Sequence, residues 1–165
     1  MIQGDIVFVQ GKGIISNIVR YIDDNGKFSH CAIATSENQI LEANIGIRVS
    51  IKDFNESEYD YVEVIDLGLT DEQRLAVYNR SLEYLGARYD YVQTIWYGLK
   101  KIFHLHGDNF LNNPKHFICS ELVFIALEEA GILSDLGIDE TYRHGIDLTP
   151  NQLYDLVKYI SKNRV

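Results

Sequence analysis

The chain has 165 residues and a formal net charge of −9 at pH 7, from 15 Lys and Arg against 24 Asp and Glu. This length suits one domain with a hydrophobic core, and a hydrophobic content of 46% excludes wholesale disorder. An acidic chain without a basic block is a poor match for a phosphate backbone or an anionic membrane. We therefore expect no nucleic-acid partner, and membrane contact is not favoured.

The N-terminal half carries most of the strand signals. Alternation and strand-forming residues predict five strands, over residues 5–9, 30–35, 39–43, 47–51 and 59–67. Apolar residues at helical spacing predict a short amphipathic helix over residues 14–22. Residues 36–38 are typical of a hairpin loop. The clustered strands favour an antiparallel sheet.

The C-terminal half has the apolar period of helices. Four helices are predicted, over residues 70–86, 91–103, 118–130 and 149–160. Thr70 with Gln73, and Thr149 with Gln152, form capping boxes at two of the helix starts. Residues 108–114 form a polar loop. Because strands and helices are segregated along the chain, the predicted fold class is α+β.

The chain has two cysteines, and one of them is a candidate nucleophile. Cys119 lies where the polar loop leads into the helix predicted over residues 118–130. A helix N-terminus carries partial positive charge and unpaired N–H groups, which stabilise a thiolate and a developing oxyanion. The alternative is that Cys119 is a small buried core residue.

His30 is the candidate base for this thiol. It opens the strand predicted over residues 30–35, so alternation places it on one face with Ala32 and Ala34, whose small side chains leave room beside the ring. Cys31 is expected to point the other way, as a core residue outside the site. By position alone, His30 can also be a strand-end histidine bonded to backbone.

Glu42 is the candidate for orienting the imidazole. If the hairpin loop spans residues 36–38, the register places Glu42 opposite Ala32, on the His30 face. The backbones are then roughly 7–8 Å apart along the diagonal, within side-chain reach. A loop one residue shorter would turn Glu42 to the opposite face, so this prediction depends on the register. The alternative is an edge-strand Glu in solvent.

Four segments together resemble a known family. They are Gly4-Asp5-Ile6-Val7-Phe8, Ser29-His30-Cys31-Ala32-Ile33, Ile40-Leu41-Glu42-Ala43 and Cys119-Ser120-Glu121-Leu122-Val123. They are similar to the permuted branch of the NlpC-type papain-fold cysteine hydrolases, the YiiX-like proteins, and more distantly to the lecithin:retinol acyltransferase relatives. Ordinary NlpC-type peptidases carry the Cys helix first. Here the His strand comes first, which is the order expected of a circular permutation.

This resemblance covers most of the chain and implies a circularly permuted papain-like fold, in which an antiparallel sheet packs against helices in a single domain over residues 1–165. It implies that Cys119 is the nucleophile, His30 the general base and Glu42 the orienting residue of a cysteine hydrolase. The implied activity is that of a thiol peptidase or amidase, without a cofactor or metal, acting on a small peptide, amide or acyl substrate. Cell-wall peptides are the commonest substrates in this family.

Tyr89 is a further candidate from the same resemblance. The stretch Gly86-Ala87-Arg88-Tyr89 resembles the Gly-x-Pro-Tyr stretch that precedes the Cys helix in this family. This makes Tyr89 a candidate for contact with the oxyanion or the substrate. Arg88 stands where the family usually has Pro, and a packing role for Tyr89 is the alternative.

The sequence leaves three rival functions open. A zinc site can be built from His104, His106, His116 and Cys119. An acyltransferase or lipid hydrolase can share the same fold, with the helix over residues 91–103 facing a membrane. The third rival is a non-catalytic binding module that keeps the substrate-binding groove of such a fold.

The N-terminus shows neither a basic region nor a long apolar stretch, and no apolar run reaches the about 20 residues of a membrane-spanning helix. The expected location is therefore cytoplasmic, or that of a phage-derived product released by lysis.

Overall fold

The computed structural model describes residues 1–43, 48–89, 116–138 and 148–164. The elements in chain order are β1 (Ile6–Gly11), α1 (Ile14–Ile22), β2 (His30–Ser36), β3 (Gln39–Glu42), β4 (Ser50–Asp53), η1 (Glu56–Glu58), β5 (Tyr59–Ile65), α2 (Asp71–Leu82), β6 (Arg88–Tyr89), β7 (His116–Phe117), α4 (Cys119–Glu129), η2 (Ser134–Leu136) and α5 (Pro150–Asn163).

Strands β1 to β5 form one sheet in the order β4-β3-β2-β1-β5, and every neighbouring pair in it is antiparallel. Strands β6 and β7 form a separate parallel pair, which the sequence analysis did not predict. The predicted α+β class and antiparallel sheet are confirmed.

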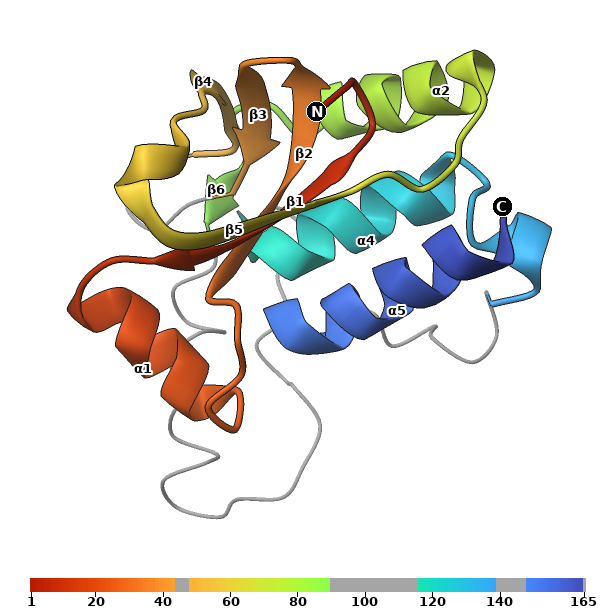
Figure 1. The fold of residues 1–165 in the computed structure, drawn as a ribbon. Coiled ribbons are helices and arrows are strands. Elements are labelled where there is room, and N and C mark those ends of the chain that lie inside the picture. The colour runs from red at the N-terminus through yellow and green to blue at the C-terminus, as the bar shows by residue number, and fades with distance from the viewer. Residues whose placement is uncertain (44–47, 90–115, 139–147, 165) are drawn as a thin grey trace.

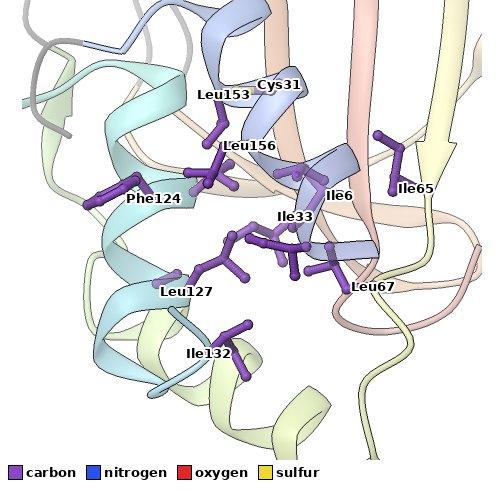
Figure 2. Close-up of a cluster of buried hydrophobic side chains, with 14 of the residues drawn as sticks. Ile6, Cys31, Ile33, Ile65, Leu67, Phe124, Leu127, Ile132, Leu153 and Leu156 are labelled. Carbon is purple, nitrogen blue, oxygen red and sulfur yellow. The ribbon is translucent and has the colours of Figure 1, made fainter. Parts of the chain in front are cut away.

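Helices α2, α4 and α5 lie against one side of the sheet, while α1 lies beyond the end of β1 that is remote from α2 (Figure 1). Figure 2 shows the core between these layers, where Ile6 and Ile33 of the sheet face Leu127 of α4 and Leu156 of α5. Burial of such a continuous apolar layer is the main stabilising contribution to a domain of this size.

The opposite face of the sheet carries a second apolar cluster. Val7, Ala32 and Ile40 are buried there, and Phe54 and Tyr59 pack over them with their rings stacked at a centroid distance of 5.7 Å. Residues of β2 thus alternate between two buried faces, as the period of a strand requires.

Helix starts agree with the sequence better than element ends do. Both capping boxes, at Thr70 and Thr149, are confirmed. Helix α2 ends at Leu82, before the predicted stop at Gly86, because a further turn lies between them and brings the Gly86 N–H to the Val49 carbonyl at 2.9 Å.

Two strands also differ from prediction. Strand β4 occupies Ser50–Asp53 where residues 47–51 were predicted, and β5 ends at Ile65 although the apolar run continues. The predicted helix over residues 91–103 and the loop over residues 108–114 lie outside the described residues. Within the described part of the chain, no helix has the length and apolar character needed to span a membrane.

Candidate active site

The loop before His30 is anchored from two sides. Ser29 Oγ accepts the Gly11 N–H at 2.9 Å and bonds the Ser16 hydroxyl at 2.8 Å. Asn151, in the first turn of α5, accepts the Phe28 N–H at 2.9 Å and donates to the Phe28 carbonyl at 2.9 Å. These bonds hold the start of β2, and with it the imidazole, in one place.

Glu42 reaches the predicted position opposite Ala32 through a turn that differs from the predicted one. The turn between β2 and β3 is one residue shorter than expected, because Ser36 pairs with Gln39. A β-bulge at Thr35 compensates, so that Ala34 pairs with Ile40 and the continuing register sets Glu42 opposite Ala32. The shorter loop alone would have turned Glu42 away, and the extra residue in β2 cancels that shift.

The carboxylate of Glu42 joins two cationic groups. Its Oε2 lies 2.7 Å from His30 Nε2, and its Oε1 lies 3.1 Å from Lys52 Nζ. Lys52 also donates to the Tyr59 hydroxyl at 3.0 Å. Burial alone would raise the pKa of Glu42, whose side chain is 2% exposed, but the bonds and charges of His30 and Lys52 lower it to about 2.

Cys119 lies at the helix start, as predicted, and is the first residue of α4, one residue after the predicted start at residue 118. The helix start is held by Ser120, whose hydroxyl donates to the Leu148 carbonyl at 2.5 Å, and by Glu121, whose carboxylate accepts the Ile118 N–H at 3.4 Å. The N–H groups of this first turn have no acceptors within the helix. They favour negative charge on or beside the sulfur.

Two neighbours interact with the Cys119 sulfur. A hydrogen bond from the Cys31 thiol is the largest influence lowering the Cys119 pKa; burial opposes it, and the charge and hydrogen bond of His30 lower the pKa further, to well below the ordinary thiol value. Burial likewise depresses the pKa of His30, but the Cys119 thiolate and the Glu42 carboxylate outweigh it and raise that pKa to about 10. The arrangement favours a thiolate–imidazolium pair.

The structure corrects the expectation that Cys31 stands apart from the site. Cys31 is a core residue, as predicted, but it also contacts Cys119, and burial raises the pKa of its own thiol well above the usual value. The reason is the placement of the sulfur. The Ala34 N–H faces β1, so by alternation the Cys31 N–H faces the other edge of β2, where it bonds the Cys119 sulfur. At that edge the Cys119 sulfur contacts both His30, from one face of β2, and Cys31, from the other face.

Lys52 and Tyr59 were missed by the sequence analysis. The predicted strand ended one residue before Lys52, so no face was assigned to it. In the sheet Lys52 pairs with Ile40, which puts it on the Glu42 face of the neighbouring strand. The signal that would have found it is the pairing of β3 with β4, which the linear pattern does not contain.

The remaining candidates are placed only in part. The backbone of Tyr89 pairs with Phe117, two residues before Cys119, while the side chains of Tyr89 and His116 lie outside the described part of the structure. His104 and His106 also lie outside it. Among the residues that are described, no group of three or more His, Cys, Asp or Glu side chains is arranged to hold a metal ion.

No protein-family model matches the chain, and no curated protein matches it significantly. A function for this site is therefore inferred from the contacts of Cys119, His30 and Glu42.

Proposed function

We propose that this chain is a thiol-dependent hydrolase with a circularly permuted papain-like fold. It cleaves an amide bond through an acyl-enzyme intermediate on Cys119. The substrate class is peptides, with cell-wall peptides as one source. The observation that carries the proposal is the continuous line of contacts from the Cys119 sulfur through the His30 ring to Glu42, at a helix N-terminus. This is the arrangement of nucleophile, base and orienting group that thiol acyl transfer requires.

In the proposed reaction, the Cys119 thiolate attacks the carbonyl carbon of the amide. First-turn N–H groups of α4 stabilise the oxyanion, and Tyr89 is a candidate second donor. His30, whose Nε2 is held by Glu42, gives its proton to the leaving nitrogen as the C–N bond breaks. Water, deprotonated by His30, then hydrolyses the thioester, which releases the acid and restores the thiolate.

The decisive experiment is selective alkylation. Iodoacetamide at neutral pH should label Cys119 rapidly and Cys31 hardly at all, because the two thiols have opposite pKa shifts. Cys119→Ser should lose both the labelling and the turnover of a panel of amide and ester substrates. Equal labelling of Cys31 and Cys119 in the native protein would refute a specially activated thiolate.

A second candidate function is acyl transfer or lipid hydrolysis on the same catalytic residues. It is favoured by α1, which leaves Ile14, Ile15, Ile18 and Tyr21 exposed. An apolar row of this kind suits an acyl chain or a lipid surface. Co-sedimentation with neutral phosphatidylcholine vesicles, lost in Ile14→Ser/Ile18→Ser, would support this candidate. Absence of binding by the unaltered protein would exclude it.

A further inference from the structure

A cavity of about 310 Å³ opens beside His30, on the sheet side opposite α4. Val9 of β1 and two residues of α1, Ile15 and Val19, give it an apolar wall. This volume is at the lower end of the range for small-molecule sites, which is roughly 300–1,000 Å³. The cavity therefore suits a compact ligand with an apolar part.

The position of the cavity beside His30 relates it to the leaving group of a substrate. In amide cleavage the imidazolium protonates the departing nitrogen, so the leaving group must lie against the general acid. His30 lines the cavity, whereas Cys119 is absent from its described lining. A ligand in the cavity is thus placed on the leaving-group side of the scissile bond and not on the acyl side.

The charges around the cavity indicate the polar end of that ligand. Lys12 and Lys52 line it with one carboxylate, Glu58, in a chain whose net charge is −9. Each ammonium has three N–H donors. Lys52 contacts Glu42 and Tyr59, while Lys12 donates to the Ser57 carbonyl at 2.6 Å. Lys12 therefore has more N–H donors available to a ligand than Lys52 has.

We propose that this cavity is the leaving-group subsite and that it takes an α-amino acid or dipeptide with an apolar side chain and a free carboxylate, which Lys12 binds. The reaction then converts an N-acyl amino acid or N-acyl dipeptide and one water into a carboxylic acid and the free amino acid or dipeptide. The C–S bond forms first, the C–N bond then breaks as the nitrogen takes the His30 proton, and the C–S bond is finally replaced by a C–O bond from water. This assignment rests on the proposed function for the role of His30 as the acid.

Binding of the released product tests the subsite without any turnover. In Cys119→Ala protein, calorimetric titration should show that leucine binds at least about tenfold more tightly than leucinamide, which lacks the carboxylate. Lys12→Gln in the same background should remove this preference. Lys27→Gln is the matched control, because Lys27 pairs with Glu63 at 3.0 Å and does not line the cavity. It should keep the preference.

The outcomes separate the subsite from the proposed function. Equal affinity for leucine and leucinamide, or a preference that survives Lys12→Gln, overturns the subsite whatever the unaltered enzyme does. A preference that depends on Lys12 supports the subsite. If the unaltered enzyme then cleaves no amide, the proposed function fails while the carboxylate site stands as a binding site.

Discussion

The Cys119 thiolate is stabilised by two neighbours that act in different ways. His30 supplies a positive charge that is itself held by Glu42, and Cys31 supplies thiol and backbone hydrogen bonds. The first contribution depends on pH, because it requires the imidazolium. The second persists as long as the Cys31 thiol is protonated, and burial raises its pKa. The thiolate is therefore expected over a wide pH range.

For the residues of the site, the first prediction concerns the pH dependence of Cys119 alkylation. The pKa of Cys119 is lowered and that of His30 is raised to about 10, so the ion pair exists between these two values. The rate of Cys119 alkylation by iodoacetamide should be nearly constant from about pH 6.5 to about pH 9, whereas an ordinary thiol gains roughly tenfold per pH unit below its pKa of about 8.5. Peptide mass spectrometry measures the rate. A tenfold rise per unit across this range would contradict the ion pair.

A second prediction concerns Lys52, which holds the Glu42 oxygen that His30 does not use. Lys52→Met should lower kcat about tenfold, equivalent to about 1.4 kcal/mol, because Glu42 loses an anchor and orients the imidazole less well. Lys52→Arg should recover part of the loss. Steady-state kinetics on any substrate that the panel identifies makes the measurement.

The matched control for Lys52 is Lys27→Met. Lys27 binds a carboxylate, Glu63, and contacts the ring of Tyr61, as Lys52 does with Glu42 and Tyr59, but Lys27 does not pair with Glu42 and does not line the cavity. Its substitution should leave kcat unchanged. Unchanged kcat in Lys52→Met as well would show that Glu42 needs no second anchor.

At the scale of elements, the β2–β3 hairpin determines whether His30 and Glu42 can meet. Alternation predicted both strands, but the turn is shorter than predicted and the bulge at Thr35 restores the register. A bulge has no clear signature in one sequence, because it depends on how two strands pair and not on either strand alone. The prediction for Glu42 therefore reached the observed face through two compensating differences.

The cap of helix α5 is expected to contribute to the stability of the protein. Thr149 caps the helix by accepting the Gln152 N–H at 3.2 Å, and Gln152 returns a bond to the Thr149 N–H at 2.9 Å. Thr149→Ala should lower the free energy of unfolding by about 1 kcal/mol, as measured by urea denaturation. Asp155→Ala, at an exposed position inside the same helix, should not destabilise, since Ala favours the helix. Equal losses in the two variants would argue against the cap.

For the whole molecule, a buried guanidinium joins three chain segments that meet at one end of the sheet, where the start of β1 lies beside the end of β5. Arg74 of α2 donates to Asp5 at 2.9 Å, to the Gln3 carbonyl at 3.0 Å and to Asp66 at 2.5 Å. Asp5 is 4% exposed. The N-terminal segment, the residue that follows β5 and the N-terminal part of α2 are therefore joined through one guanidinium.

Arg74→Met should lower the free energy of unfolding by about 3–5 kcal/mol, because it leaves the Asp5 carboxylate buried without its partner. Asp5→Asn in addition should recover part of the loss. Arg80→Met is the control from the same helix: its pair with Glu83, at 2.9 Å, is exposed, so the expected change is within about 0.5 kcal/mol. Similar losses for Arg74 and Arg80 would show that burial of the pair does not matter.

The sequence by itself determined the local features of this protein. Capping residues and apolar periods predicted the starts of α2, α4 and α5, alternation predicted the sheet strands, and a helix start identified Cys119, because each of these depends on residues near one another in the chain. Only the tertiary structure decided which side chains meet. The register of three strands brings Lys52 to Glu42 and Glu42 to His30, and the packing of α4 against the edge of β2 brings Cys31 to Cys119. Such contacts depend on pairings between distant segments, which one sequence does not specify residue by residue.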